Sequence, residues 1–339
     1  MYDITIAIPV YNVEKYIEKS LCSALKQNFT GTYEILVIDD CGSDNSMAIV
    51  NMLEKKHSKG SLIRIVKHPY NMGLGPARNT AIAEAKGRYL FFLDSDDWIS
   101  ENCLSILFSK AEETKAEITC GSVCRVEEKT GSIIKRNVYS NRLVNHINAG
   151  VFMFVNKIDM HIEAWNKLFL MSFIRDNHLE CIHKIMEDSV FDFNVRTLAK
   201  RICLVSEETL FYNIRENSIL TKIYNKKGSD ESAFVYCDII NQIQKLIKTK
   251  YEHVPGIYDL YYLRLIYSFT SLSRSSYNRI QQNYIKKHLA GFNHFIPSIK
   301  CFQIRFYKLL YLFSSIHENY KFFLWLNNTL SRILKKIKN

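Results

Sequence analysis

Three carboxylates follow a short apolar run in the first third of the chain, and two of them, Asp94 and Asp96, lie two residues apart and could hold a divalent metal ion. Leu90 to Leu93 gives four large apolar side chains in a row, and Asp94, Asp96 and Asp97 follow. Such a run is typical of a strand buried on both faces of a parallel sheet. Carboxylates this close together repel one another unless a cation lies between them. Oxygen ligands favour Mg²⁺ or Mn²⁺, which proteins usually hold through one or two carboxylates and substrate phosphates.

The same acidic residues also fit a simpler interpretation as a surface turn. Asp96, Asp97 and Ser100 would then cap a helix that opens near Glu101. Asp and Ser are preferred at the capping position of a helix, so this alternative is chemically reasonable. The choice between a ligand site and a turn depends on the elements that surround the cluster.

Four apolar runs end near Pro9, Asp39, Lys67 and Asp94, and each predicts a β-strand. The spacing of roughly 30 residues between these ends matches βαβ crossovers, with a helix expected over Val13 to Lys26. We therefore expect a doubly wound, mostly parallel sheet flanked by helices. Its strand ends would gather polar residues along one edge, where ligands bind in open α/β sheets.

The order of elements beyond the fourth strand is less regular. A strand is predicted over residues 116–125, a polar hairpin turn at 129–132, a helix that follows residue 188 and runs to about 200, and a late strand over 210–214. A soft boundary falls near residue 225. A dinucleotide-binding dehydrogenase would carry G-x-G-x-x-G after the first strand, where this chain reads Pro-Val-Tyr-Asn, so that class is excluded.

The composition is that of a globular protein, since 47% of the 339 residues are hydrophobic and 23% are charged. No secretory signal is visible, and no apolar run reaches the roughly 18 to 20 residues of a membrane span. The nine cysteines are scattered, without a C-x-x-C pair. We expect reduced thiols in a cytoplasmic protein, and neither a disulfide framework nor a zinc site.

Read together, the strand-end motifs resemble glycosyltransferase family 2, the GT-A-fold enzymes of bacterial polysaccharide assembly. The resemblance runs from about residue 4 to residue 218, and its motifs are Ile8 to Asn12, Val37 to Asp44, Asn71 to Asn79 and Leu93 to Asp97. It implies a Rossmann-like GT-A catalytic domain over residues 1–225, with a nucleotide-sugar half over about 1–100 and an acceptor half over about 101–225. Residues 226–339 would form a helical, basic, aromatic-rich extension.

The resemblance implies that the strand ends bind a nucleoside-diphosphate sugar and its metal ion. Asp39 matches the aspartate that accepts a hydrogen bond from uracil, which points to a UDP-linked donor; a dTDP-linked donor presents the same ring edge. Asp94 and Asp96 match the D-x-D motif, with Asp94 near ribose and metal and Asp96 as direct ligand of Mg²⁺ or Mn²⁺. Arg78 would reach the nucleotide and Arg215 would close over the diphosphate. The other expected donor contacts are Pro9, Tyr11, Asn12, Asp40 and Ser95.

The acceptor half supplies the catalytic base in this comparison. Asp188 matches the base and Glu187, beside it, is the second candidate and an acceptor contact, while Trp165, Asn166 and Lys167 match an acceptor-side segment. One carboxylate that takes the acceptor hydroxyl's proton suffices for an inverting displacement. The simpler alternatives are that Asp188 caps a helix and that Trp165 is a core aromatic. The expected acceptor is a hydroxyl of a glycan or lipid-linked oligosaccharide in surface polysaccharide or capsule synthesis.

The C-terminal tail is strongly basic. Residues 300–339 carry eight lysines and arginines against one glutamate, and aromatic residues lie between them. This pattern is typical of a helix in the membrane interface, so we expect peripheral docking on the anionic inner face of the cell membrane and no nucleic-acid partner. The alternative is an appendage packed on the catalytic domain or a second subunit. A non-catalytic nucleotide-sugar or membrane-surface module with a degenerate GT-A fold would explain the tail but not the acids at the sheet edge.

Overall fold

A computed structural model describes residues 2–156, 158–182, 187–215, 238–239, 241–254 and 257. All of them belong to one compact unit, which comprises residues 1–226 and 238–257. The predicted boundary near residue 225 and the predicted membrane-docking tail lie outside the described residues, and both stay predictions.

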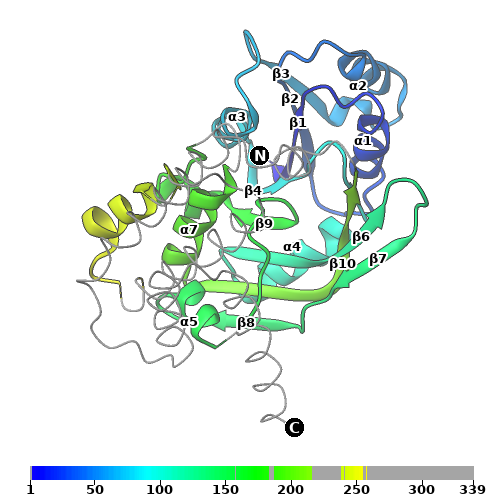
Figure 1. Cartoon of the computed structure of the whole chain (residues 1–339). Helices are drawn as coiled ribbons and strands as arrows, with labels where there is room; N and C mark the ends of the chain where they lie inside the picture. Colours follow the sequence, from blue (N-terminus) through cyan, green and yellow to red (C-terminus); the bar gives the residue numbers. More distant parts are fainter. Residues whose placement is uncertain are drawn as a thin grey trace, which may run out of the picture. The chain divides into compact units, whose positions relative to one another are not determined.

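The N-terminal part alternates strands and helices as expected (Figure 1). The order of strands across this half is β3-β2-β1-β4, and every pairing in it is parallel. Val10 pairs with Asp39, and Asp39 pairs with Lys67, so the carboxyl ends of three strands reach the same edge. The elements are β1 (Tyr2–Val10), α1 (Ile17–Leu25), β2 (Tyr33–Asp39), α2 (Ser46–Lys56), a 3₁₀ turn (Gly60–Leu62), β3 (Ile63–Lys67), α3 (Leu74–Glu84) and β4 (Gly87–Phe92).

The second part extends the same sheet with mixed polarity. From β4 the order continues β9-β6-β10-β5; β9 is antiparallel to both neighbours, and β6 and β10 are parallel. The fold is therefore a mixed α/β sheet flanked by helices, which confirms the predicted fold class. The elements are β5 (Trp98–Ile99), α4 (Cys103–Thr114), β6 (Ile118–Glu127), β7 (Ile133–Asn137), β8 (Arg142–Asn145), α5 (Ala149–Val155), β9 (Lys167–Leu170), α6 (Met171–Asp176), α7 (Asp188–Leu198), β10 (Arg201–Ile214) and a π-helix (Ile247–Tyr251).

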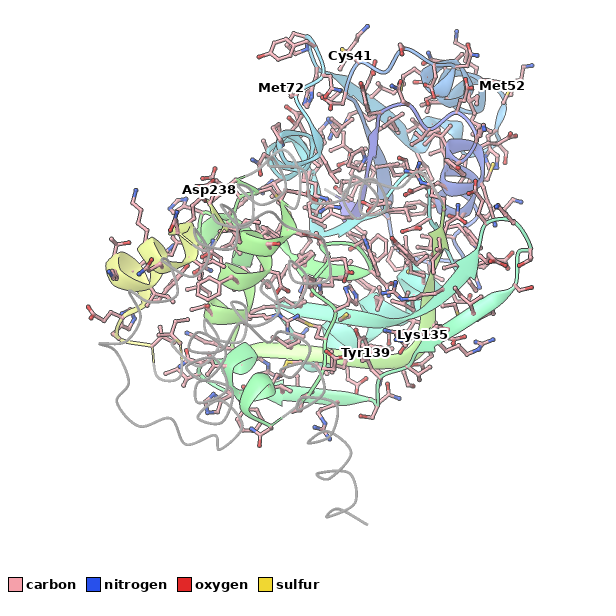
Figure 2. All side chains as sticks on the ribbon, in the orientation of Figure 1. Cys41, Met52, Met72, Lys135, Tyr139 and Asp238 are labelled. Atoms are coloured by element: carbon pink, nitrogen blue, oxygen red, sulfur yellow. The ribbon has the colours of Figure 1, made fainter. Side chains whose placement is uncertain are left out.

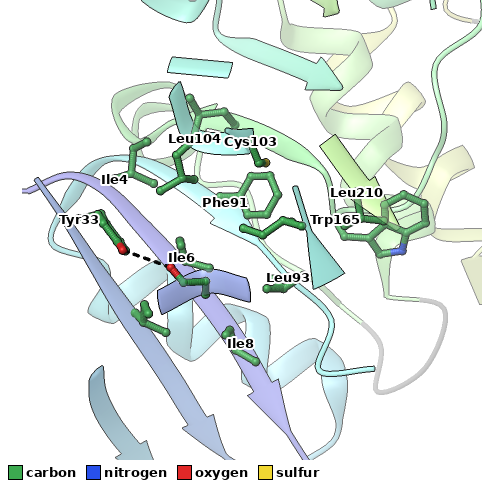
Figure 3. Packing of buried hydrophobic residues seen from close by; sticks show 14 of the residues in the cluster. Ile4, Ile6, Ile8, Tyr33, Phe91, Leu93, Cys103, Leu104, Trp165 and Leu210 are labelled. Carbon is green, nitrogen blue, oxygen red and sulfur yellow. Dashed lines mark hydrogen bonds between the residues drawn. The ribbon is translucent and has the colours of Figure 1, made fainter. Parts of the chain in front are cut away.

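The central strands are buried on both faces, because alternate residues of each strand enter two separate cores. Ile6 and Phe91 pack in the core shared with α1, α2 and α4, close to Trp165 and Leu210 (Figure 3). Ala7 belongs to the core on the opposite face, with α3, α5, α6 and α7. Burial of large aliphatic side chains contributes about 1.5 to 3 kcal/mol each, so these cores hold the polar strand ends in fixed positions.

Several boundaries differ from the sequence predictions, each for a local reason. α1 begins at Ile17 rather than Val13: the residues before it form a turn in which the Val13 carbonyl accepts the N–H groups of Tyr16 (2.9 Å) and Ile17 (3.0 Å), while the Val13 N–H donates to Ser46 Oγ (2.9 Å). β1 runs one residue past Pro9, to Val10. β10 is much longer than predicted, since its polar middle, around Glu208, is taken up by a bulge.

One short segment from the predicted C-terminal region packs against the sheet unit. The Tyr251 hydroxyl donates a 2.8 Å hydrogen bond to Asn194 Oδ1 on α7, and its ring lies 6.2 Å from that of Phe193. Within the described part of the chain, no helix has the length and apolar character needed to cross a membrane.

Candidate active site

The three carboxylates that follow β4 converge on one point. Asp94, Asp96 and Asp97 each offer an oxygen, and these oxygens lie within 4.8 Å of one another. The turn that carries them is closed by a 3.1 Å hydrogen bond from the Asp97 N–H to the Asp94 carbonyl. The N-cap of α4 is Asn102, which makes no side-chain capping bond, and it is not Asp96, Asp97 or Ser100. The alternative of a plain helix cap is therefore wrong.

Asp97 is the most deeply enclosed of the three. One carboxylate oxygen accepts the N–H of Asn213 on β10 at 2.8 Å. The other, Oδ2, is buried and has no hydrogen-bond partner among the described residues. A buried carboxylate oxygen without a partner is costly, and a nearby cation would relieve that cost. The donor set therefore suits a hard divalent ion.

Arg78, on α3, connects this cluster to α7. Its Nη2 donates a 2.9 Å hydrogen bond to Asp94 Oδ1, and its Nη1 forms an ion pair with Glu187. Only 1% of the Arg78 side chain is exposed. The residues expected at the donor side and at the base are thus joined through one buried guanidinium.

Asp188 follows Glu187 as the first residue of α7. Glu187 occupies the N-cap without a side-chain capping bond, so Asp188 is not the cap that the simpler alternative required. Asp188 remains partly exposed, whereas Glu187 is buried. A carboxylate on a partly exposed residue, next to a buried acidic group, is a suitable general base.

Arg215 lies on the other side of the acidic cluster, directly after β10. Its Nε donates a 2.6 Å hydrogen bond to Asp96 Oδ2, and its guanidinium carbon lies 4.9 Å from the centre of the Tyr16 ring. The Tyr16 hydroxyl in turn donates to Glu128 Oε1 at 2.6 Å. The positively charged guanidinium of Arg215 is thus held at Asp96, the carboxylate predicted to bind metal.

Burial and mutual repulsion make these acids hard to ionise together. Burial, reinforced by Asp96 and Asp94, raises the pKa of Asp97 well above its ordinary value. Burial, reinforced by Glu187, does the same to the pKa of Asp188, and Arg78 only partly opposes it. Raised pKa values caused by burial and a specific charged neighbour are typical of functional sites.

The loops after β2 and β3 form the neighbouring part of the edge, and Cys41 and Met72 mark them in Figure 2. Asp40 accepts hydrogen bonds from the N–H groups of Met72 (2.8 Å) and Gly73 (2.9 Å), and from His68 Nδ1 at 2.7 Å. Gly73 has φ 97°, a conformation that favours glycine. Asp40 thus anchors the loop that leads into α3, and its predicted contact with a donor stays a prediction.

Asp39 and Asn12 organise the loops next to that anchor. Asp39 Oδ1 accepts the Cys41 N–H at 3.0 Å, and Asn12 Oδ1 accepts the Ser43 N–H at 2.8 Å. Asn12 and Cys41 both have positive φ, 52° and 58°. Tyr11 is 45% exposed beside them. The roles of Pro9, Tyr11, Asn12, Asp39 and Ser95 in donor binding remain predictions.

Trp165 lies in an aromatic stack rather than on an open surface. Its ring is 4.5 Å from that of His161 and 5.5 Å from that of Tyr212, both nearly parallel to it. Arg125 caps the stack, with its guanidinium carbon 5.0 Å from the centre of the Tyr212 ring. Trp165 itself is 3% exposed, so any contact with an acceptor would involve the edge of this stack.

Asn166 and Lys167 are also engaged inside the protein. Asn166 donates to the carbonyls of Gly121 (2.8 Å) and Ser122 (3.1 Å) and accepts the Thr209 hydroxyl at 2.7 Å. Lys167 Nζ donates to the carbonyl of His161 at 2.7 Å. These bonds fix the start of β9 between β4 and β6. The acceptor roles assigned to both residues stay predictions.

Sequence reasoning missed the contributions of three residues to this site. Asp97 was visible in the acidic cluster but was given no role of its own. Tyr16 and Tyr212 enter through tertiary contacts alone, with Arg215 and with Trp165. Nothing in their sequence spacing signals those contacts.

Comparisons with known proteins show which family the chain resembles in sequence and in fold. A sequence profile of glycosyl transferase family 2 matches residues 5–181, just over half of the chain. Glycosyltransferase GlyA of Streptococcus pneumoniae is 29% identical over 66% of this chain and 32% of its own length. A UDP-Glc:α-D-GlcNAc-diphosphoundecaprenol β-1,3-glucosyltransferase of Escherichia coli, WfgD, is 30% identical over 54% of this chain and 74% of its own length.

The fold also has a counterpart among solved structures. TarS 1–349 of Staphylococcus aureus, solved in complex with UDP-GlcNAc, superposes with a TM-score of 0.67 and 22% identity, over 86% of this chain and 80% of that one. The chain spans about a third of the length of GlyA, so that relative contains further regions with no counterpart here. The structural match supports the same arrangement of strands and helices.

Proposed function

Because the chain belongs to glycosyl transferase family 2, we propose that it is an inverting glycosyltransferase that uses a nucleoside-diphosphate sugar, UDP-linked, as donor. The sugar would go to a hydroxyl of a glycan or lipid-linked acceptor in the synthesis of a cell-surface polysaccharide. The observation that carries the proposal is the convergence of Asp94, Asp96 and Asp97 at the carboxyl edge of the sheet, with Arg78 and Arg215 on either side.

Asp94 and Asp96 would hold Mg²⁺ or Mn²⁺. The fit rests on three carboxylate oxygens within 4.8 Å and on the buried Asp97 oxygen without a partner among the described residues. When bound, the metal would offset the negative charge that develops on the leaving diphosphate. Arg215, which pairs with Asp96, would add a second positive charge close to the phosphates, and charge fixed in advance is usually the largest catalytic contribution.

Asp188 would take the proton of the acceptor hydroxyl. Its carboxylate is partly exposed, and Glu187, the second candidate, is already engaged in a buried ion pair with Arg78. A single base opposite the leaving group gives inversion at the anomeric carbon, since no second carboxylate is needed as nucleophile. The role of Glu187 is then to support Asp188 and the acceptor.

The donor would lie over the loops that follow β1 and β2, with Asp39 meeting the base and Tyr11, Asn12 and Ser95 around the ribose and phosphates. The names of two similar proteins support the choice of UDP: WfgD is a UDP-Glc-dependent transferase, and TarS 1–349 was solved with UDP-GlcNAc. A dTDP-linked donor presents the same edge of the base to Asp39, and competition between the two nucleotides distinguishes them.

The acceptor would approach from the side of Trp165 and Asp188. The name of WfgD specifies a sugar on a diphosphoundecaprenol carrier, which is a lipid-linked acceptor. Such an acceptor would place the enzyme at the inner face of the membrane, where the basic segment of residues 300–339 would dock on anionic lipid. This location and the docking are part of the proposal.

Thermal unfolding with nucleotides tests the donor site without knowledge of the acceptor. The midpoint is measured with UDP and dTDP, in Mn²⁺ or in chelator, for the wild type and for Asp96→Ala. We expect UDP to raise the midpoint only with metal, and the substitution to abolish this rise. Glu113→Gln removes an exposed carboxylate on α4 and serves as the control, with the wild-type response expected.

A folded wild-type protein that responds to no nucleotide would contradict the proposal. That result would favour a non-catalytic module that binds a membrane surface. A response to UDP that does not depend on metal, or that survives Asp96→Ala, would contradict the assigned metal site and leave the nucleotide site in place.

A further inference from the structure

Arg78 connects two acidic groups from distant parts of the chain, and it does so inside the protein. Asp94 lies at the end of β4 and Glu187 lies ahead of α7, and one guanidinium pairs with both. Both Nη atoms are occupied and only 1% of the side chain is exposed. The guanidinium keeps three further N–H donors, one of them a buried Nε without a partner among the described residues, so the two ion pairs alone do not use up its donors.

We propose that Arg78 is a positioning residue that fixes Asp94 relative to the pair Glu187 and Asp188. The inference rests on the proposed function, since Asp94 is placed at the metal and donor and Asp188 at the acceptor hydroxyl. Arg78 then sets the separation between the two halves of the site. This one side chain, on α3, thus links the charge of Asp94 after β4 to that of Glu187 before α7.

Arg78 is needed because three carboxylates, those of Asp94, Glu187 and Asp188, lie close to its guanidinium with little solvent to screen them. Glu187 is 3% exposed, and the Asp94 side chain is 23% exposed. Removal of one partner of a buried ion pair leaves an uncompensated charge, which is strongly unfavourable. Without Arg78, the repulsion between Asp94 and Glu187 would push apart the turn after β4 and the start of α7.

The choice of arginine follows from geometry. A guanidinium is a planar fork that holds two carboxylates at a fixed separation, whereas a lysine ammonium is a point charge on a flexible stem. The guanidinium carbon lies 5.6 Å from the centre of the Phe92 ring, and that ring fills one side of the pocket. The position of α3 is set in turn by Asp40, which binds the backbone of Gly73 at the helix start.

A matched control lies at the opposite edge of the sheet. Arg64 on β3 also pairs with two glutamates, Glu34 at 3.0 Å and Glu84 at 3.1 Å. Glu34 lies near the start of β2, away from the carboxyl ends that carry the site. Arg64→Met therefore removes an arginine that also bridges two carboxylates, though a more exposed one, without touching Asp94 or Glu187.

The test combines nucleotide binding with turnover in Arg78→Met, Arg78→Lys, Glu187→Gln and the Arg78→Met/Glu187→Gln double variant. The UDP dissociation constant is measured by calorimetry in Mn²⁺, and turnover by hydrolysis of UDP-glucose or UDP-GlcNAc. We expect Arg78→Met to lose at least about 100-fold in kcat and to lose UDP affinity by a smaller factor, because Asp94 is displaced but the other donor contacts remain. We expect Glu187→Gln to cost nothing further in the Arg78→Met background, because residues that act as one unit are non-additive.

Two results would overturn the proposal. A loss in UDP affinity as large as the loss in kcat, in both Arg78 variants, would show that Arg78 acts on the nucleotide itself and not on the relative position of the two halves of the site. Losses in kcat that multiply in the double variant would show that Arg78 and Glu187 act independently. Arg64→Met is expected to lower the unfolding midpoint and to leave kcat and UDP affinity unchanged.

The outcome can be separated from that of the proposed function. If the wild type neither binds UDP nor turns over a UDP-sugar, the proposed function fails. The unfolding midpoints of the wild type, Arg78→Met, Glu187→Gln and the double variant then still test the coupling between Arg78 and Glu187. Shifts of Arg78→Met and Glu187→Gln that fail to add support the connection, and shifts that add in full contradict it.

Discussion

Arg215 and Asp96 form an ion pair at the centre of the proposed metal site, with 2.6 Å between Arg215 Nε and Asp96 Oδ2. Asp96 is the carboxylate for which the sequence predicts direct metal coordination. Its side chain is 20% exposed and that of Arg215 is 16% exposed, so the pair is largely shielded from water. The arginine and a metal ion would therefore compete for the same carboxylate.

This competition predicts that Arg215→Gln tightens metal binding in the absence of nucleotide. A hydrogen bond to a charged group contributes about 1.5 to 3 kcal/mol, and partial exposure reduces that value, so we expect a gain of about three- to tenfold. Mn²⁺ titration followed by calorimetry or electron paramagnetic resonance measures it. In the presence of the donor we expect the same variant to lose turnover, because a positive charge near the diphosphate is gone.

Arg136→Gln is the control for that measurement. Arg136 pairs with Glu208 at the surface of β6, β7 and β10, and its substitution changes the net charge by the same amount. We expect its Mn²⁺ affinity to equal that of the wild type. An Arg215→Gln protein that binds Mn²⁺ no more tightly than the wild type would show that the ion pair does not oppose the metal.

Asp188→Asn should separate donor binding from transfer. The substitution keeps the size of the side chain and removes the base, and general-base catalysis typically contributes about 10²- to 10⁴-fold. We expect transfer to fall by that factor while the UDP dissociation constant stays within about twofold. Asp176→Asn, at the exposed end of α6, is the matched control and should retain wild-type transfer. Near-normal turnover in Asp188→Asn would refute the assignment.

The pH profile gives an independent reading of the same residue. Burial and the neighbouring Glu187 raise the pKa of Asp188 above that of an ordinary aspartate. A base must be unprotonated, so activity is lost as the pH falls through this raised pKa, at a higher pH than for an exposed carboxylate. Glu187→Gln removes one cause of the shift, and we expect the acid limb of kcat to move to lower pH. An acid limb that moves to higher pH or stays in place would contradict the assigned coupling.

The sequence predicted the edge of the sheet well because that edge is set by local patterns. Apolar runs and their terminal acids place Asp39 and Asp94 at strand ends, and the structure confirms those ends. The partners of the acids were not predictable, because Arg78 meets Glu187 across 109 positions and Arg215 meets Asp96 across 119. Only the packing of α3, α7 and β10 on the sheet brings them together.

The hydrogen bonds that hold Asn166, in the predicted acceptor-side segment, inside the protein could not be predicted for the same reason. Asn166 has φ 56°, and its amide is held by the backbone of β6, which no pattern around Trp165 signals. Asp40 likewise accepts backbone N–H groups from a loop 32 positions away. A motif shows which residue types are present, while the structure shows which of their hydrogen bonds are already made.

The stack behind Trp165 predicts a pH dependence of stability that is separate from activity. Burial, with the nearby positive charge of Lys167, lowers the pKa of His161 to about 4. Between about pH 6.5 and 4 the unfolded chain takes up a proton at this residue and the folded protein does not. Stability therefore falls as the pH falls through this window, by about 1.4 kcal/mol per pH unit and about 3 kcal/mol in all.

His161→Phe keeps an aromatic ring beside Trp165 and removes the titrating group. We expect the free energy of unfolding, measured in urea at pH 7 and pH 5, to fall less in this variant than in the wild type. Tyr139→Phe is the control: it removes the hydroxyl that accepts the backbone N–H of His161 at 2.9 Å, but it leaves the imidazole in place. That protein should keep the pH dependence of the wild type. Equal pH dependence in His161→Phe and in the wild type would show that His161 titrates alike in the folded and unfolded chains, and would contradict the lowered pKa.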